Sequence, residues 1–374
     1  MKNKLMLISA FFVLASWTNA KDGRWPMFRG DPSLLGRSAV VLPDQPELLW
    51  SFKTEEPIHS SVAIHDGMAV FGSMDGHLYA LNLKDGKKIW SFKTEGEIEG
   101  SPLILSNRVF VGSGDAHLYA IDLKTGKQVW KYKTEDRILG GANWSMVPND
   151  PTPRILVGSY DFMLHCVDAE KGELQWSYET DNYINGSPAI HKGHVYFGGC
   201  DGILHKVNIE TGDRTGQLEV GAYMAGSAAI EHDIAYIGNY DNTFIAADMM
   251  DNKILWEYTE SGFPFFSSPA VGKDIVVFGG RDKRVHAVNK ETGKQLWQFR
   301  TKARVDSSPV IARDKVVVGS DDGQLYILNL KDGKKAWSYE IGMSIIGSPA
   351  IADGMILIGS EDGSLYAFGQ QEEK

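Results

Sequence analysis

The chain repeats a segment of about forty residues, and this repetition limits its possible folds more than any other feature. Each copy carries a tryptophan at the same place, except that Gly216 stands where the fifth one is due. The steps between these positions are 40, 40, 46, 40, 40, 41 and 40 residues. A repeat of this length must pack on its neighbours to bury its apolar faces. We therefore predict that the tryptophans dock one copy on the next: Trp50, Trp90, Trp130, Trp176, Trp256, Trp297 and Trp337.

An aspartate marks the same turn in every copy and gives a count of eight copies. One aspartate per copy would place these carboxylates far apart around a ring, so we expect them to cap turns rather than to bind a metal. No metal site is predicted. The eight aspartates are Asp75, Asp115, Asp161, Asp201, Asp241, Asp282, Asp322 and Asp362.

Each copy has the pattern of four short strands. In the first complete copy, side chains alternate with period two over residues 77–82, Lys84-Asp85-Gly86 turns the chain, and another strand follows over 87–92. Two earlier strands are expected at 60–64 and 68–73. Four-stranded repeats of this length are typical of β-propellers. The sequence predicts an all-β fold, an eight-bladed β-propeller of four-stranded antiparallel blades, over residues 47–369.

The two ends of the repeat array complement each other. The last copy, residues 347–368, supplies three strands, and residues 47–52 form a single strand without a copy of its own. We predict that this N-terminal strand, which contains Trp50, completes the last blade and closes the ring. Residues 21–46 are expected to form a strap packed by Trp25 and Phe28, and residues 370–374 a C-terminal tail.

The first twenty residues resemble an export signal. Lys2 and Lys4 precede an apolar run over 5–17, and cleavage is expected near Ala20, which predicts a periplasmic or secreted protein. No later stretch reaches membrane-spanning length. Removing residues 1–20 leaves 36 basic and 48 acidic residues, a balance that disfavours nucleic acid as a partner. Cys166 and Cys200 are the only cysteines, and either a bridge or two free thiols is compatible with their positions.

One motif relates the repeat to a known family. Residues 120–130 match the pattern Ala-x-Asp-x-x-Thr-Gly-x-x-x-Trp, and looser copies end at Trp90, Trp256, Trp297 and Trp337. The chain thereby resembles the pyrroloquinoline quinone (PQQ)-like propeller repeat family, which includes quinone-dependent alcohol dehydrogenases and non-enzymatic propellers similar to outer-membrane protein assembly factor B (BamB). For the enzymes, the resemblance implies a disulfide between adjacent cysteines over the quinone, a calcium ion and an aspartate base. This chain has no adjacent cysteines, and no cysteine near the predicted cleavage site to carry a lipid.

Departures from the repeat identify the candidate binding residues. The entrance to the first strand of each copy presents a mixed ring near the propeller axis, which either binds a small ligand or is filled by water. That ring consists of His59, Glu99, Leu139, Asn185, Ala225, Phe266, Asp306 and Ile346, and Tyr223 and Arg304 lie two positions earlier in their copies. The third copy carries Asn143-Trp144 in place of the usual Ser-Pro and six extra residues between its first two strands. Its partner-binding candidates are Trp144, Pro148, Asn149 and Asp150.

No catalytic motif is present, and no catalytic residue is predicted. We expect an exported non-enzymatic scaffold, a monomer, that binds a protein partner in the cell envelope; the resemblance implies outer-membrane protein assembly as the process. No cofactor is expected for such a scaffold. The alternative is a PQQ-dependent or related small-molecule oxidoreductase that uses PQQ with calcium.

Overall fold

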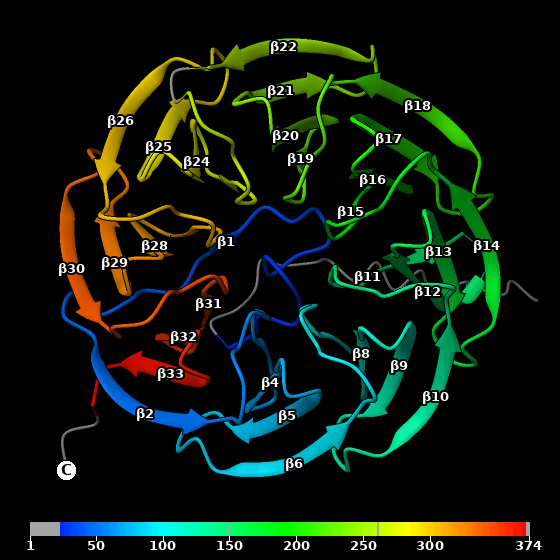
Figure 1. Ribbon diagram of the computed structural model, residues 1–374, viewed down its shortest axis with the longest axis horizontal. Helices are drawn as coiled ribbons and strands as arrows, with labels where there is room; N and C mark the ends of the chain where they lie inside the picture. Colours follow the sequence, from blue (N-terminus) through cyan, green and yellow to red (C-terminus); the bar gives the residue numbers. More distant parts are fainter. Residues whose placement is uncertain (1–22, 149, 260–261, 372–374) are drawn as a thin grey trace, which may run out of the picture.

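The structure, a computed structural model, describes residues 23–148, 150–259 and 262–371. In it, eight sheets stand around a central axis like the blades of a wheel (Figure 1). The predicted all-β, eight-bladed propeller is confirmed. Within the described part of the chain, no helix has the length and apolar character needed to cross a membrane. The predicted export signal with its cleavage site near Ala20, Asn149 and the last three residues of the tail lie outside the described residues.

Each blade is an antiparallel meander whose first strand lies nearest the axis (Figure 1). Blade 1 contains β3 (Ala63–His65), β4 (Met68–Gly72), β5 (His77–Asn82) and β6 (Lys88–Lys93). Blade 2 contains β7 (Leu103–Leu105), β8 (Arg108–Gly112), β9 (His117–Asp122) and β10 (Gln128–Lys133). Blade 3 contains β11 (Asn143–Val147), β12 (Asp150–Gly158), β13 (Met163–Asp168) and β14 (Leu174–Glu179). Blade 4 contains β15 (Ala189–His191), β16 (His194–Gly198), β17 (Ile203–Asn208) and β18 (Arg214–Glu219).

The second half of the ring repeats this arrangement. Blade 5 contains β19 (Ala229–Glu231), β20 (Ile234–Gly238), β21 (Phe244–Asp248) and β22 (Lys253–Tyr258). Blade 6 contains β23 (Ala270–Val271), β24 (Ile275–Gly280), β25 (Arg284–Asn289) and β26 (Gln295–Arg300). Blade 7 contains β27 (Val310–Ala312), β28 (Lys315–Gly319), β29 (Gln324–Asn329) and β30 (Lys335–Glu340). Blade 8 contains β31 (Ala350–Ala352), β32 (Met355–Gly359), β33 (Ser364–Gly369) and, from the N-terminal part of the chain, β2 (Glu47–Lys53).

The ring closes through β2, as predicted. This strand pairs antiparallel with β33, and Trp50 lies opposite Ala367. The innermost strands are shorter than expected, since β3 begins at Ala63 rather than at residue 60. The reason is that the preceding residues bond to neighbouring blades: the backbone N–H of Ser61 donates to Ser101 Oγ at 3.1 Å.

The repeated tryptophans dock neighbouring blades. Trp90 Nε1 donates to the carbonyl of Leu123 at 2.8 Å, and its ring lies against Gly126, where an added Cβ would come within 2.7 Å of the ring. Gly126 also has a φ of 67°, a conformation that favours glycine. Five other tryptophans make the same hydrogen bond: Trp50 to Leu83, Trp130 to Ala169, Trp176 to Ile209, Trp256 to Lys290 and Trp297 to Leu330. Trp337 packs on Phe368 in blade 8.

The junction between blades 4 and 5 lacks a tryptophan and is rebuilt from other residues. Gly216 lies opposite Lys206, and Lys206 Nζ donates to the carbonyl of Met249 at 3.2 Å. This is the bond that a tryptophan makes at the equivalent junctions. Asn252 replaces the turn glycine, and its Oδ1 lies 2.8 Å from where a Cβ on Gly216 would be. A buried lysine stem and an asparagine therefore fill the space left by the missing indole.

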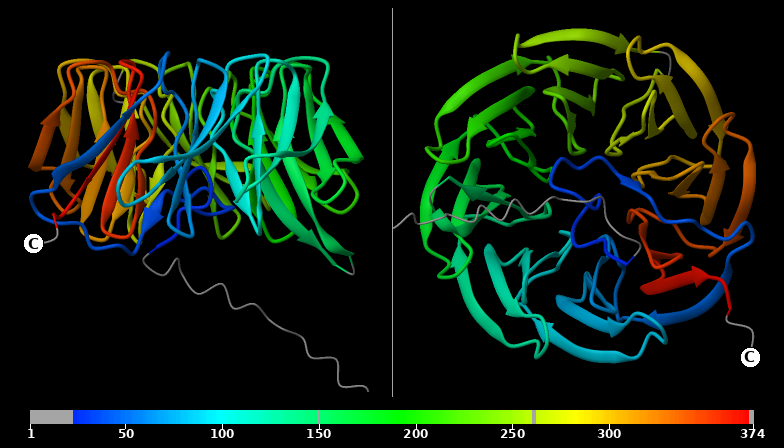
Figure 2. Two further views of the ribbon diagram at one scale, coloured as in Figure 1. Left: turned by 90° about the horizontal axis from the view of Figure 1, so that it is seen from below. Right: turned by 180° about the vertical axis from the view of Figure 1, so that it is seen from behind.

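Residues 23–46 lie across one end of the central channel (Figure 2). Trp25 forms an antiparallel bridge with Ile64 of blade 1, and β1 (Arg37–Ser38) adds a parallel strand to β27 of blade 7. No pattern in the sequence predicted β1. Five further blades also bond to this strap, through Ile104 to Pro26, Asn143 to Pro32, Ile190 to Pro32, Ile230 to Ser33 and Val271 to Leu35. The strap thus binds the innermost strands around the ring.

Arg29 fastens the strap to blades 6 and 7. Its side chain is 1% exposed, and its guanidinium donates to the carbonyls of Ser308, Pro269 and Pro309 at 3.1, 2.7 and 2.6 Å. Burial lowers the pKa of Arg29 to about 9, although the charge of Asp31 acts in the opposite direction. Three accepting carbonyls offset part of the cost of burying this charge.

Candidate functional site: the open end of the channel

The loops at the end opposite the strap form the mouth of the channel. Since strands alternate in direction, the turn between the second and third strands meets the loop that enters the same blade from the preceding one. A backbone N–H of the turn donates to a loop carbonyl in every blade. The eight donor–acceptor pairs are Met74 to Pro57, Gly114 to Glu97, Tyr160 to Arg137, Cys200 to Tyr183, Tyr240 to Tyr223, Arg281 to Pro264, Asp321 to Arg304 and Glu361 to Ser344.

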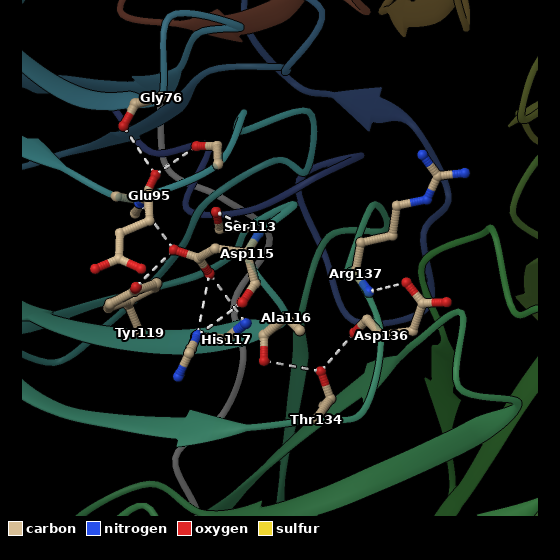
Figure 3. A network of polar contacts seen from close by, with 12 residues as sticks. Gly76, Glu95, Ser113, Asp115, Ala116, His117, Tyr119, Thr134, Asp136 and Arg137 are labelled. Carbon is tan, nitrogen blue, oxygen red and sulfur yellow. Dashed lines mark hydrogen bonds and ion pairs between the residues drawn. The ribbon is translucent and has the colours of Figure 1, made fainter.

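The repeated aspartates hold this end of the ring together. Asp115 Oδ1 accepts from the N–H of His117 at 3.1 Å, which caps the turn as expected (Figure 3). Asp115 Oδ2 also accepts from Tyr119 Oη at 2.7 Å and from the N–H of Glu95, in the loop entering the blade, at 2.9 Å. Burial and this contact raise the pKa of Tyr119, so the phenol remains a donor. The aspartate therefore ties a blade to its entering loop as well as capping a turn.

Three blades replace the tyrosine of this clasp with histidine. In blade 3, His165 Nε2 lies 3.0 Å from Asp161 Oδ2, and Tyr132 of blade 2 bonds to His165 Nδ1 at 3.0 Å. Burial raises the pKa of Asp161, but the contact with His165 and backbone bonds outweigh it and hold the pKa below its ordinary value. The same arrangement joins Asp201, His205 and Tyr178 in blade 4, and Asp282, His286 and Tyr258 in blade 6. These buried groups belong to the scaffold.

A cavity of about 260 Å³ lies on the axis beneath the mouth. The structure brings together all eight residues of the predicted ring around it: His59, Glu99, Leu139, Asn185, Ala225, Phe266, Asp306 and Ile346. Phe28 of the strap also lines it, so the cavity ends where the strap crosses the channel. Tyr223 and Arg304 are absent from the lining and stand further out on the mouth.

A ring of seven serines forms the wall of this cavity. Each serine forms a hydrogen bond to a neighbouring blade. For example, the N–H of Ser187 donates to Ser227 Oγ at 2.8 Å. Gly141 takes the equivalent place in blade 3, since its N–H donates to Ser187 Oγ. The prediction that Asn143-Trp144 replaces the usual Ser-Pro pair was therefore wrong. Gly141-Ala142, two residues earlier, occupies those positions. A Cβ on Gly141 would lie 3.0 Å from Ser187 Oγ, so the tight approach here is between blades, and Phe28 of the strap lies at ordinary contact distance.

Several charged groups around the cavity are paired. Arg281 donates to both carboxylate oxygens of Asp306, at 3.0 and 2.8 Å. His59 Nε2 lies 2.5 Å from Glu361 Oε1. Arg304 forms an ion pair with Asp321, and this contact raises the pKa of the Arg304 guanidinium.

Aromatic and arginine side chains gather on one part of the mouth, over blades 3 to 6. Tyr223 and Tyr240 stack with their ring centroids 4.2 Å apart, and Tyr240 lies 5.7 Å from Phe266. Arg281 covers the Phe266 ring at 3.6 Å. Tyr183 stacks on Tyr160, and Arg137 lies over that tyrosine. We call this set the aromatic arc; it consists of Arg137, Tyr160, Tyr183, Tyr223, Tyr240, Phe266 and Arg281.

The candidates from the third copy lie at the other end of the ring. Trp144 belongs to β11, and Pro148 and Asp150 lie at the tip of the extended β11–β12 hairpin, which projects on the strap side (Figure 2). Arg154 pairs with Asp150 there. Trp144 packs in the same apolar cluster as Phe28. The predicted residues therefore do not form one site.

Sequence reasoning missed most of the aromatic arc. Tyr160, Tyr240 and Arg281 each directly precede a repeat aspartate, so this position was visible in the repeat alignment. Neither cysteine is bridged: Cys166 is buried, and burial raises its pKa to about 12, whereas Cys200 accepts a bond from Asn185 at the mouth.

The fold and its repeat define an eight-bladed propeller of the PQQ-like class. More particularly, the chain belongs to the family described as outer membrane protein assembly factor BamB, whose model matches residues 37–149, 142–259 and 219–374. No curated protein matches the sequence.

Three solved structures share the fold. BamB from Moraxella catarrhalis is 20% identical with a TM-score of 0.74, and the match covers 88% of this chain and 99% of that one. The computationally designed Ika8 protein is 17% identical with a TM-score of 0.75 over 87% and 100% of the chains. Quinohemoprotein alcohol dehydrogenase from Comamonas testosteroni is 13% identical with a TM-score of 0.79 over 94% and 82%. At these identities the similarity shows the fold and transfers no activity.

Proposed function

We propose that this protein is an exported, non-enzymatic scaffold that binds a protein partner in the cell envelope, with the aromatic arc as its docking surface. The observation that carries the proposal is the exposure of rigid aromatic side chains on one face. Tyr183 and Tyr240 are 40% and 42% exposed although each stacks on a second tyrosine. Tyrosine and arginine are enriched at the energetic centres of protein interfaces.

The arc suits recognition because it is already ordered. Ring stacking and the contact between Arg281 and Phe266 fix these side chains before a partner arrives, which reduces the entropy lost on binding. Membership of a family described by outer membrane protein assembly agrees with a partner in the envelope. It also makes assembly of outer-membrane proteins the process in which we propose that the scaffold acts.

The residues of the mouth do not fit PQQ with calcium. Within the described residues, no three His, Cys, Asp or Glu side chains are grouped as metal ligands. Asp306, the one aspartate in the described wall of the cavity, accepts from both Nε and Nη2 of Arg281 and is therefore paired rather than free to act as a base. Neither cysteine has an adjacent cysteine with which to cover a quinone. These observations support a scaffold over an oxidoreductase.

A site-specific cross-linking experiment tests the proposal. A photo-reactive phenylalanine analogue is placed at Tyr183 in the arc, and at Val41, which is 64% exposed on the strap side, as a matched control. We expect one discrete envelope protein to cross-link in cells at Tyr183 and not at Val41. Equal or absent cross-linking at both positions contradicts the docking surface. Dye-linked alcohol oxidation by the purified protein with PQQ and calcium would favour the enzyme instead.

A further inference from the structure

We propose that the axial cavity binds one neutral, polyhydroxylated ligand of the size of a single sugar residue. This inference goes beyond the scaffold role and concerns the cavity beneath the aromatic arc. It depends on the seven serines of the cavity wall, which we call the hydroxyl ring, and on the amide oxygen of Asn185. It depends also on the charged groups near the cavity and on the side chains of Phe28 and Phe266.

The serine O–H groups of the hydroxyl ring are donors that have no acceptor among the described residues. Its seven serines are 3% to 8% exposed, and they are Ser61, Ser101, Ser187, Ser227, Ser268, Ser308 and Ser348. Six of their Oγ atoms accept an N–H from the preceding blade. Among the described residues, none of the seven hydroxyls donates to a protein acceptor. Their protons are therefore available to oxygen atoms inside the cavity.

Asn185 adds an acceptor to the same cavity. Its Nδ2 donates to Cys200 Sγ at 2.9 Å, whereas its Oδ1 is buried and has no donor within the described part of the protein. Buried polar groups normally find partners, so this oxygen is available to accept a hydrogen bond from a water molecule or a ligand in the cavity. A ligand hydroxyl both donates and accepts, so a polyol matches Asn185 and the serines together.

The charges favour a neutral ligand over an ion. Arg281 is paired with Asp306, and the described lining of the cavity contains no arginine or lysine that could hold an anion. Glu99 also lines the wall and adds negative charge. A sulfate or phosphate ion would lie near these carboxylates without a compensating arginine. Hydroxyl groups avoid this repulsion.

Shape and apolar contacts favour a ring. Phe28 lies at the closed end of the cavity, and Phe266 lines its wall while Arg281 covers one face of the phenyl ring. These surfaces can pack on the C–H face of a sugar, as apolar groups do in most ligand sites. The volume of about 260 Å³ is slightly below the range of about 300–1,000 Å³ that holds drug-sized ligands. One sugar ring, and not an oligosaccharide, fits this space.

The test is a titration of the full chain, without its predicted export signal, by calorimetry and ligand-observed NMR. The probes are glucose, N-acetylglucosamine and sodium sulfate at constant ionic strength. Ala225→Trp fills the lining, and Ala222→Trp places the same side chain in the same loop outside it. A Ser227→Ala/Ser268→Ala double variant removes two hydroxyls without adding bulk.

We expect one of the sugars to bind with one-to-one stoichiometry at millimolar concentration. Ala225→Trp should weaken binding at least tenfold, the double serine variant about fivefold to tenfold, and Ala222→Trp less than twofold. Failure of both sugars to bind, binding that survives Ala225→Trp, or sulfate binding in their place overturns the proposal. Thermal unfolding of each variant shows that the fold is intact. Cross-linking at Tyr183 reports on the protein partner separately, because Tyr183 lies outside the cavity lining.

Discussion

The two ends of the channel are built in opposite ways. At the strap end, one segment crosses the axis and bonds to the innermost strands of blades all around the ring, and Arg29 is buried against three carbonyls. At the mouth, no segment of the described chain crosses the axis, and each blade contributes its own loop and turn (Figure 1). The strap end is closed and uniform, whereas the mouth is open and differs from blade to blade.

The difference separates stability from recognition. Strap bonds use mainly backbone groups, which are the same in every blade and fix the position of the strap regardless of its side chains. The mouth positions vary instead: at the turn that donates to the entering loop, blades 3 and 5 carry tyrosines, blade 4 carries Cys200, and blades 1 and 2 carry Met74 and Gly114. We therefore expect substitutions at the strap to reduce stability and substitutions at the mouth to reduce binding.

The largest contrast is expected between two arginines. Arg29→Ala removes three buried hydrogen bonds and leaves their carbonyls without donors, so it should lower the free energy of unfolding by about 3 kcal/mol or more. Arg304→Ala breaks a half-exposed ion pair with Asp321 and should cost less than about 1 kcal/mol. Urea unfolding followed by tryptophan fluorescence measures both. Equal losses would remove the distinction between the two ends.

Two glycines with positive φ provide a matched pair. Gly36 in the strap has a φ of 60°, and an added Cβ would lie 1.9 Å from Arg29 Nη2. Gly342 at the mouth has a φ of 93°, and nothing lies within 4 Å of an added Cβ. Gly36→Ala should therefore cost about 3 kcal/mol, and Gly342→Ala only the conformational penalty of about 1 kcal/mol. Thermal unfolding compares the variants; a smaller loss at Gly36 contradicts the tight packing of the strap.

The strap should also respond to pH through Asp31. Burial raises the pKa of Asp31 to about 6, while the N–H of Leu35 and the charge of Arg37 act in the opposite direction. Because the folded state holds this proton more tightly than the unfolded state, Asp31 stabilises the fold at low pH. That contribution is lost as pH rises from about 4 to 6.

Replacing Asp31 isolates this contribution. Relative to Asp31→Asn, the wild-type protein should lose roughly 2 kcal/mol of unfolding free energy between pH 4 and pH 7. Urea unfolding at both pH values gives the difference. A constant difference between the two proteins across this range would show that Asp31 does not titrate in this way.

The smallest effect on stability is expected in the aromatic arc. Tyr183→Ala removes the stacking contact with Tyr160 and an edge contact with the neighbouring Phe162, and because Tyr183 is exposed it should change the unfolding free energy by only about 1 kcal/mol. The same change should reduce partner cross-linking from an analogue at Phe162 at least tenfold, whereas Tyr183→Phe should retain most of it. Loss of stability without loss of cross-linking would assign this tyrosine to the scaffold.

The sequence was sufficient for the architecture because the repeat specifies it. Seven tryptophans, six of them lying against a turn glycine of the next copy, and the position of Trp50 ahead of the first complete copy required eight blades and a closing strand. The strap could not be placed in the same way, since its contacts use backbone groups that carry no sequence signal. Arg29 gave no indication of burial, because its acceptors are the main-chain carbonyls of residues more than 200 positions away.

The candidate site was predictable in part. The order of strands identified the residues that enter each blade, and they line one cavity. The same order also implies that the loop between the first two strands lies at the other end, so Trp144 and Asp150 could have been separated from His59. The stacking of Tyr240 and Phe266 was not predictable, because it depends on how closely neighbouring blades approach.

The closing strand has a consequence for biogenesis. β2 is the first blade strand to be synthesised, but its partner β33 ends at Gly369. During synthesis β2 therefore has no partner until nearly all of the remaining polypeptide has been made. Until then β2 and the edge of the newest blade both expose unsatisfied amides, which invites pairing with other molecules. Long loop closure also makes this step slow. A chaperone that shields an extended segment near residues 47–53 would therefore help this protein most in the interval before its last strand arrives.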